Sequence, residues 1–269
     1  MIGLLGLGFL GQHIWLRPGL PPGSWGAGHR SEAGIPVLPF DWGQPPSWAA
    51  LPEQGALVLS IPPLSQDPEA ETQRLEHWGR WMNQHRPGLK RLVYISSTGV
   101  YPNQPGDYSE DTPAEPDGLR GQMRLASELA LAPFFDLKVI RPAAIYGPGR
   151  GIPARIKAGQ PIPSDSGPIY RIHVDDLAQI ALLAAIETNF PPLVLAADQG
   201  PASSLAVAEW LLAQPTWAGR GLSLNLEEGY LARKGYGSHP ERRLTPKRLQ
   251  EMGYRYLFPT YQEGLQDEL

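Results

Sequence analysis

The stretch that decides the fold is Met1–Gly11, which reads MIGLLGLGFLG. Its short apolar run, residues 2–5, leads into Gly6, Gly8 and Gly11 in GxGxxG spacing, and residues 12–15 continue in a pattern that suits a helix. This spacing predicts a strand, a tight turn and a helix start. In such a turn the first glycine allows the bend, the second lets the backbone approach a pyrophosphate, and the third lets helix and strand pack closely.

Taken alone, the GxGxxG spacing also fits an ordinary glycine-rich loop or a secretory leader. A secretory leader needs a positively charged start, and no Lys or Arg precedes Arg17. The choice between a loop and a nucleotide-binding turn depends on the residues downstream.

Composition narrows the class of protein. The 269 residues are long enough for one large α/β domain or for a nucleotide domain with a smaller partner. The chain has no cysteine, which excludes disulfides, thiol nucleophiles and thiolate metal sites. The net charge of −4 gives no general attraction to nucleic acid, and no apolar run approaches the roughly 18 residues of a membrane span. We expect a cytoplasmic protein with no nucleic-acid partner and no membrane partner.

Strand and helix patterns alternate along the first 200 residues. This alternation predicts parallel βαβ units in an α/β fold, a doubly wound sheet with ligands at the carboxyl ends of its strands. The predicted strands cover residues 2–5, 24–28, 35–40, 56–61, 91–96, 137–140 and 193–197, and the longer predicted helices cover residues 69–85, 119–131 and 173–186.

Composition also predicts the domain organisation. Residues 1–200 form the dinucleotide-binding domain, and residues 201–269 form a small carboxyl-terminal substrate lobe in which 222–226 reads as a strand. The Gly- and Pro-rich stretch at about residues 146–170 is expected to be a loop over the site. Thr245 and Pro246 suit the cap and first residue of a helix.

Several residues qualify as cofactor ligands by their place in this scheme. Arg30 lies about 20 residues past the glycines, where a basic residue accommodates the 2′-phosphate of NADP and an acid would favour NAD. Asp41 follows the third predicted strand, where the loop would pass the adenine. The turn after the fourth predicted strand adds Ser60, Ile61 and Pro62, while Phe9 and Leu10 lie within the glycine motif.

Four stretches together resemble the extended short-chain dehydrogenase/reductase superfamily, which includes NAD-dependent sugar-nucleotide epimerases and dehydratases. They are GLGFLG at residues 6–11, YISSTGVY at 94–101, RPAAIYGPG at 141–149 and IHVDDLA at 172–178. The resemblance spans residues 1–197. It implies a Rossmann-type sheet and a nicotinamide cofactor, NADP in preference to NAD.

The resemblance also implies roles for individual residues. It places the hydroxyl beside the reacting carbon on Ser97, with Thr98 as a substitute, and it adds Ser96 and Pro142 to the cofactor ligands. The Tyr and Lys that the superfamily carries four residues apart on one helix face are replaced here by Arg120 and Arg124.

This departure puts the usual proton transfer in doubt. A guanidinium group stays protonated and presents a fork of donors, so Arg120 and Arg124 can bind an anion or a ribose hydroxyl but cannot shuttle a proton. The acid would then come from another residue; the candidates by type are Tyr101, Tyr108, Tyr146 and His173. Ala143 and Ala144 stand where sugar-nucleotide epimerases tend to carry Asn, which argues against a UDP-sugar. Cations that remain for an anionic substrate are Arg150, Arg155 and Arg171.

The sequence leaves three functions open. The first is an NAD(P)-binding, epimerase-like oxidoreductase acting on a small carbonyl or hydroxyl compound. The second is a catalytically silent protein that senses NADP or serves as a scaffold, and the third is a non-redox lyase or isomerase. The resemblance further implies a homodimer formed through the two long helices.

Overall fold

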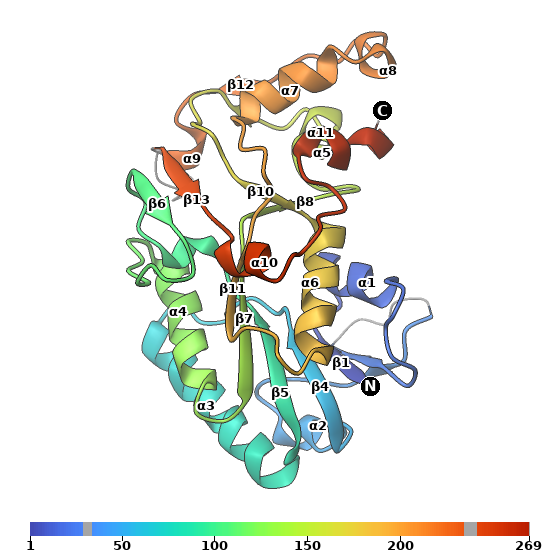
Figure 1. Ribbon diagram of the computed structural model, residues 1–269, viewed down its shortest axis with the longest axis vertical. Helices are drawn as coiled ribbons and strands as arrows, with labels where there is room; N and C mark the ends of the chain where they lie inside the picture. The colour runs from blue at the N-terminus through green and yellow to red at the C-terminus, as the bar shows by residue number, and fades with distance from the viewer. Residues whose placement is uncertain (29–33, 234–240, 269) are drawn as a thin grey trace. The chain divides into compact units, whose positions relative to one another are not determined.

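The computed structural model describes residues 1–28, 34–233 and 241–268 (Figure 1). Its strands are β1 Ile2–Leu5, β2 Trp25–Ala27, β3 Val37–Leu38, β4 Gln54–Leu59, β5 Gly88–Ile95, β6 Gly106–Tyr108, β7 Asp136–Pro142, β8 Ala144–Tyr146, β9 Ile162–Pro163, β10 Arg171–His173, β11 Leu193–Ala196, β12 Leu226–Glu227 and β13 Arg242–Leu244. Its α-helices are α1 Phe9–Trp15, α2 Pro45–Trp48, α3 Pro68–His85, α4 Leu119–Leu131, α5 Ile152–Lys157, α6 Val174–Ile186, α7 Ser204–Leu212, α8 Pro215–Ala218, α9 Tyr230–Arg233, α10 Lys247–Glu251 and α11 Tyr261–Gly264. Short 3₁₀ turns are η1 Thr98–Val100 and η2 Gln266–Glu268.

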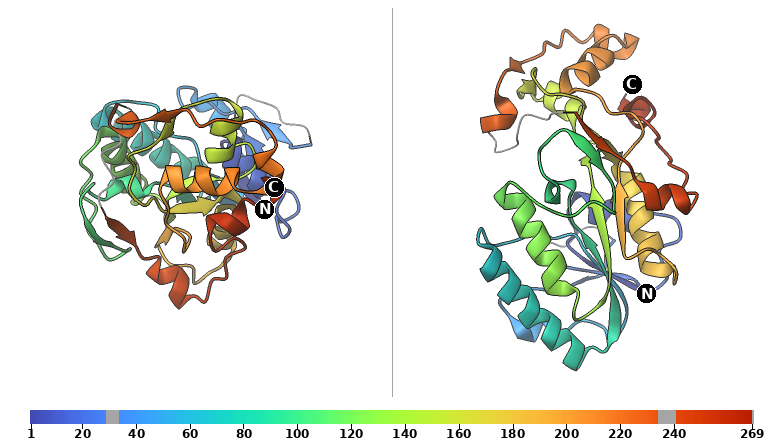
Figure 2. Two further views of the ribbon diagram at one scale, coloured as in Figure 1. Left: turned by 90° about the horizontal axis from the view of Figure 1, so that it is seen from above. Right: turned by 60° about the vertical axis from the view of Figure 1, so that its left-hand side comes forward.

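Seven strands form the central sheet in the order β11-β7-β5-β4-β1-β2-β3. The neighbours from β7 through β5, β4, β1 and β2 to β3 all pair in parallel. Helices α3 and α4 lie on one face of this sheet and α6 lies on the other (Figure 2). Strands covered on both faces read as continuous apolar runs, as β1 and the second half of β4 do. The predicted α/β fold with a doubly wound parallel sheet is confirmed.

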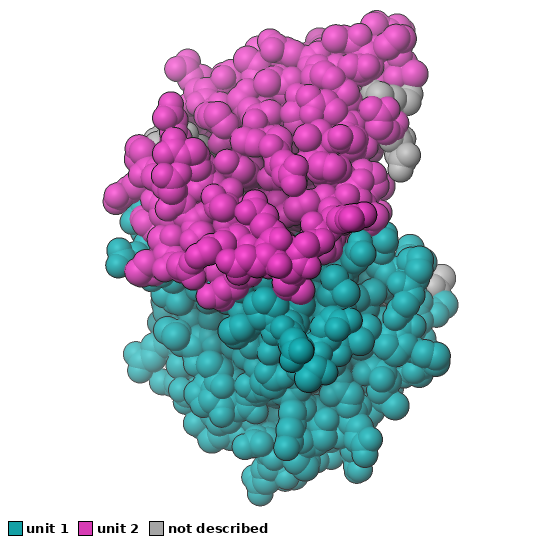
Figure 3. Space-filling view, in the orientation of Figure 1, with its two compact units in different colours: residues 1–100, 114–141, 177–194 teal, residues 101–113, 142–176, 195–269 magenta. Residues whose placement is uncertain are grey.

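The chain divides into two compact units, which Figure 3 colours separately. The first comprises residues 1–100, 114–141 and 177–194, and the second comprises residues 101–113, 142–176 and 195–269. The second unit thus contains the predicted lobe, residues 201–269, together with residues 101–113, 142–176 and 195–200. The predicted boundary at residue 200 stays a prediction.

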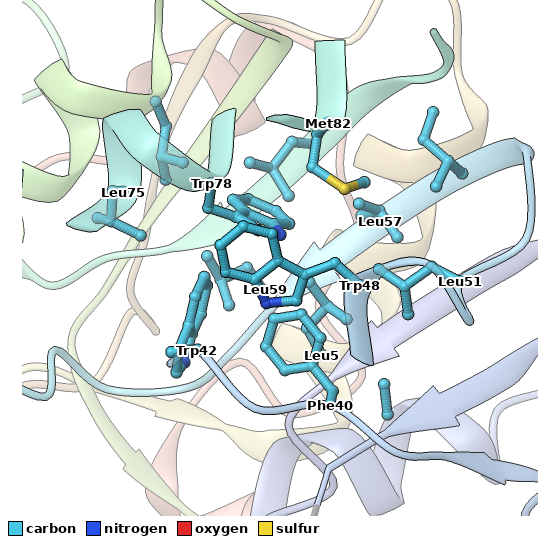
Figure 4. Close-up of a cluster of buried hydrophobic side chains, with 14 of the residues drawn as sticks. Leu5, Phe40, Trp42, Trp48, Leu51, Leu57, Leu59, Leu75, Trp78 and Met82 are labelled. Carbon is cyan, nitrogen blue, oxygen red and sulfur yellow. The ribbon is translucent and has the colours of Figure 1, made fainter. Parts of the chain in front are cut away.

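An aromatic cluster fills the core of the first unit (Figure 4). Helix α3 supplies Trp78, which is fully buried and meets Trp42 edge-on with ring centres 5.2 Å apart. The helix begins where the Asp67 side chain accepts the Glu69 N–H at 3.0 Å, with Pro68 as its first residue. The predicted range of this helix, 69–85, is therefore confirmed to within one residue.

The second unit corrects three expectations. The stretch 146–170 is not a simple loop, because it contains α5 and β9; the apolar residues Ile152 and Ile156 of α5 are buried against α7. Residues 222–225 are not a strand, and only Leu226–Glu227 pairs, with β9. Helix α10 begins at Lys247, so Pro246 is its cap and not its first residue.

Candidate functional site

The glycine turn follows β1 directly and depends on two glycines for its shape. Gly6 has φ +105°, which favours glycine, and a Cβ there would lie 2.8 Å from the Ser60 Oγ. At Gly11 an added Cβ would overlap the carbonyl oxygen of Gly6. Helix α1 can therefore start immediately behind the strand only because Gly11 has no side chain.

Gly8 is a glycine for a different reason. Its φ is −73°, which any residue can adopt, and a Cβ at this position would meet no atom within 4 Å among the described residues. Gly8 is the N-cap of α1, no side chain of the described chain caps this helix, and its first turn contains no acid. The amides of Phe9 and Leu10 lie in the first turn, where N–H groups have no partner within the helix. The turn thus offers open space at the amino-terminal end of a helix, which fits a phosphate.

The turn lies where the order of the sheet reverses. From β1 the chain goes to β2 and β3 on one side, while β4, β5, β7 and β11 continue on the other. In open α/β sheets this switch point is where ligands bind. Ser60 follows β4 here: its N–H donates to the Leu5 carbonyl at 2.9 Å, and its hydroxyl donates to the Gly6 carbonyl at 3.0 Å.

The other residues predicted after β4 follow Ser60. Ile61 is half-buried and would touch a Cβ at Gly6, while Pro62 is exposed. The structure therefore brings Gly6, Ser60 and Ile61 together.

Ser96 is buried at the end of β5 and belongs to a charged cluster. Its hydroxyl donates to Glu128 of α4. The same carboxylate receives two guanidinium N–H groups of Arg141 from β7, at 3.1 and 2.7 Å. Glu128 and Arg141 are 7% and 5% exposed, so this is a buried ion pair with its charges mutually satisfied. The Ser96 side chain thus helps fix α4 to the sheet.

Ser97 occupies the next position and is half-buried. Its Oγ accepts the Gly99 N–H at 3.0 Å, which starts the η1 turn. Gly121 of α4 packs against this turn so closely that a Cβ there would overlap the Gly99 carbonyl oxygen. The sequence analysis did not identify Gly121 as important, because the sequence does not show what a glycine inside a predicted helix contacts.

Arg124 has a fixed place beside the end of β5. Its Nη1 donates to the Ile95 carbonyl at 2.8 Å and to the Tyr94 hydroxyl at 3.3 Å, and the guanidinium lies 5.8 Å from the centre of the Tyr94 ring. Burial raises the pKa of Tyr94, although the charge of Arg124 opposes the shift. Arg120 lies one turn earlier on α4 and is exposed. Tyr94 is a contact of Arg124 that sequence reasoning did not identify.

The four candidate acids lie in the second unit and all bond to the backbone. The hydroxyls of Tyr101, Tyr108 and Tyr146 donate to the carbonyls of Ser109, Gln104 and Thr260, and His173 Nδ1 accepts the Asp175 N–H. Burial raises the pKa of Tyr146 far above its ordinary value, and the nearby carboxylates of Asp198 and Asp176 add to the shift. Tyr146 is thus a poor proton donor at neutral pH.

The structure does not bring the remaining predicted site residues together with the glycine turn. Asp41 accepts the Gly43 N–H at 2.7 Å and so shapes the turn before α2. Pro142 is buried in the second unit, and Arg30 lies outside the described residues. The guanidinium groups of Arg155 and Arg171 donate to backbone carbonyls, which ties both to their own unit. Within the described chain, no group of three His, Cys, Asp or Glu side chains could hold a metal ion.

Sequence comparisons match the chain to a curated relative over about half of its length. No family model matches the chain. The curated protein YeeZ of Escherichia coli K12 is 30% identical over 132 residues, and this match spans 48% of the chain and 47% of YeeZ, about half of that relative's length. A membrane-spanning helix is absent from the part of the chain that the structure describes.

Solved structures match almost the whole chain, and two of them illustrate the likeness. A protein from Methylobacillus flagellatus, designated an NAD-dependent epimerase/dehydratase, has a TM-score of 0.71 at 22% identity and covers 99% of this chain and 96% of its own. The human epimerase family protein SDR39U1, solved with NADPH, has a TM-score of 0.75 at 18% identity, with coverages of 99% and 98%. The chain therefore has the fold of the short-chain dehydrogenase/reductase and epimerase/dehydratase structures, and the resemblance inferred from its motifs is confirmed at the level of the fold.

Proposed function

We propose that the chain binds a nicotinamide dinucleotide at its first glycine turn and acts as an epimerase-like oxidoreductase on a small carbonyl or hydroxyl compound. The observation that carries this proposal is Gly8. Its open surroundings lie at the switch point of the sheet, at the amino-terminal end of α1. A solved protein with the same fold contains NADPH.

The residues present fit such a cofactor. The amides of Gly8, Phe9 and Leu10 would hold the pyrophosphate, and Ser60, Ile61, Pro62 and Ser96 would line the neighbouring strand ends. Asp41 would lie toward the adenine, and Arg30 would favour the 2′-phosphate of NADP over NAD. The superfamily resemblance adds Pro142 as a further cofactor ligand. When bound, the nicotinamide supplies or accepts a hydride.

The chain's own residues would orient and polarise the substrate. Ser97 already accepts a hydrogen bond from Gly99, which leaves its O–H to donate to a carbonyl oxygen. Arg124, held by Ile95 and Tyr94, would face the ribose with its remaining N–H groups. Arg120 adds a second guanidinium on the same helix, which supports an anionic substrate such as a carboxylate or a phosphate.

A second function, a protein that binds NADP without catalysis, has its own support. A guanidinium group cannot replace the phenol of a Tyr-Lys pair as a proton donor, and both positions of that pair hold arginine here. The four other candidate acids bond to the backbone of the second unit. A carbonyl panel separates the two functions: turnover of NADPH that disappears in Ser97→Ala supports the oxidoreductase, and binding without turnover supports the silent protein.

The binding proposal is tested by Gly8→Val. Its β-carbon enters open space, so we expect the variant to fold normally while the affinity for NADP(H) falls at least about tenfold, a loss of ~1.4 kcal/mol of binding. Isothermal titration of the purified chain measures both NADP(H) and NAD(H). Gly219→Val is the matched control, because Gly219 has φ −82° and an added Cβ there also meets no atom within 4 Å.

Two results would contradict the proposal. One is that the unaltered chain binds neither NADP(H) nor NAD(H) at millimolar concentration. The other is that Gly8→Val binds as tightly as the Gly219→Val control.

A further inference from the structure

Arg124 of the first unit is a half-buried cation with no acidic partner in the described part of the chain. Its helix, α4, contains one acid, Glu128, and that carboxylate pairs with Arg141 at 2.7 Å. The guanidinium of Arg124 instead touches two neutral groups, the Ile95 carbonyl and the Tyr94 hydroxyl. Burial raises the pKa of Tyr94, so its phenol is uncharged at neutral pH. Dipoles therefore hold the charge of Arg124, and no anion balances it.

The free edge of this guanidinium is a fork of two donors. A guanidinium has five N–H groups. Nη1 donates to the Ile95 carbonyl at 2.8 Å and to the Tyr94 hydroxyl at 3.3 Å, so Nε and Nη2 have no hydrogen-bond partner among the described residues. Neither atom is among the buried polar atoms that lack a partner there, so both are open to solvent. Nε–H and one Nη2–H are parallel and match the two oxygens of a carboxylate. The other Nη2–H is left for the ribose.

Tyr94 fixes the direction of the fork. This residue of β5 is 1% exposed, and its ring centre lies 5.8 Å from the guanidinium of Arg124. The ring and the two hydrogen bonds of Nη1 hold the side chain before any ligand arrives. Such preorganisation lowers the entropy cost of binding.

The fork lies at the same strand end as the proposed reacting hydroxyl. Its anchor, Ile95, is the last residue of β5, and Ser97 follows two residues later. Gly121, in the first turn of α4, packs against the carbonyl oxygen of Gly99. This part of the helix therefore lies against the turn that Ser97 starts. The carboxyl end of a parallel strand, where ligands bind in such sheets, thus carries both a cationic fork and a hydroxyl.

We propose that Arg124 binds a carboxylate of the substrate through Nε and Nη2, so that the substrate is a small carbonyl or hydroxyl acid whose reacting oxygen meets Ser97. The inference rests on the proposed function, since it names the substrate class of that site. One fork and one unbalanced charge suit a monoanionic carboxylate better than a phosphate group, which carries up to two charges and three acceptor oxygens.

Arginine side-chain NMR of the full chain tests the fork directly. The ¹⁵Nε–¹Hε signal of Arg124, assigned by correlation to its own backbone, is followed while acetate, pyruvate or benzoylformate is added, each compared with its uncharged amide. We expect the carboxylates to shift this signal saturably and to bind at least about tenfold more tightly than the amides. Methyl phosphate is the competing probe.

Three results would overturn the proposal. The first is that no carboxylate shifts the Arg124 signal at tens of millimolar. The second is that acids and amides act equally, and the third is that methyl phosphate binds more tightly than every carboxylate.

A conservative variant separates the fork from its charge. Arg124→Lys keeps the positive charge but removes the parallel donors. We expect the affinity for the carboxylates, measured by isothermal titration, to fall at least about tenfold in this variant. Arg80→Lys, on the exposed surface of α3, is the matched control and should leave that affinity unchanged. Equal affinities in the two variants would contradict the role of the fork.

Titrations with and without NADP⁺ keep this inference apart from the cofactor proposal. Carboxylate binding at Arg124 in a chain that binds neither NADP(H) nor NAD(H) would refute the cofactor site and support the fork. Binding of NADP(H) without any carboxylate response at Arg124 would refute the fork alone.

Discussion

At the scale of single residues, the three glycines of the first turn have three different physical roles. Gly6 provides a positive φ beside Ser60, Gly11 permits contact between α1 and the turn, and Gly8 keeps a space open. Two of them are therefore required by the fold, and the third is required only if something binds there.

This division predicts that a side chain added at Gly11 destabilises the fold, whereas one added at Gly8 does not. Gly11→Ala should destabilise the chain by about 3 kcal/mol or more, because the new methyl group overlaps the Gly6 carbonyl in a rigid turn. Urea unfolding followed by circular dichroism measures the loss, with Gly219→Ala as the control. A Gly11→Ala variant as stable as this control would show that the turn can adjust.

At the scale of elements, a buried polar cluster and a close glycine contact help to hold α4 in place. Glu128 joins the helix to Ser96, which follows β5, and to Arg141 of β7, and Gly121 brings its first turn against η1. These contacts also fix where Arg120 and Arg124 project from the helix. Stability and site geometry therefore depend on the same helix.

Removing the carboxylate from this cluster should be costly. Glu128→Ala leaves the buried Arg141 guanidinium without its counter-charge, and we expect a loss of about 3–5 kcal/mol in the free energy of unfolding. Glu76→Ala breaks the Glu76–Arg80 pair on the surface of α3 and should change stability by less than ~1 kcal/mol. Denaturant titration of both variants compares them, and equal losses would contradict the role assigned to Glu128.

At the scale of the whole molecule, the chain divides into two compact units, and the proposed dinucleotide turn belongs to the first. The glycine turn and both arginines of α4 lie within this unit. A ligand at the turn should therefore stabilise the first unit directly.

Cofactor binding should appear as added stability. At a concentration of about 100 times its Kd, NADPH should raise the free energy of unfolding by ~2.7 kcal/mol if it binds only the folded chain. Tryptophan fluorescence follows unfolding of both units, because Trp42, Trp48 and Trp78 are buried in the core of the first and Trp217 is buried in the second. The Gly8→Val variant should show little of this gain, and an undiminished gain in it would place the ligand elsewhere.

The sequence by itself determined the sheet and its first turn. The run 2–5 and the glycine spacing predicted β1, the turn and α1, and helical periodicity located α3 to within one residue. The helix predicted at residues 119–131 has the range that the structure shows for α4. These features arise from interactions between residues a few positions apart, so the local pattern is sufficient to identify them.

Only the tertiary structure decided which polar groups meet. Glu128 with Arg141, Arg124 with Tyr94, and Tyr254 with Asp176 join different elements. The pairing of Leu226–Glu227 with β9 is likewise a contact between segments far apart in the sequence. Hydrophobic periodicity shows that a face is buried but not what lies against it. The physical reason is that a buried charge or hydroxyl is stable only with a partner, and the path of the chain through space chooses that partner.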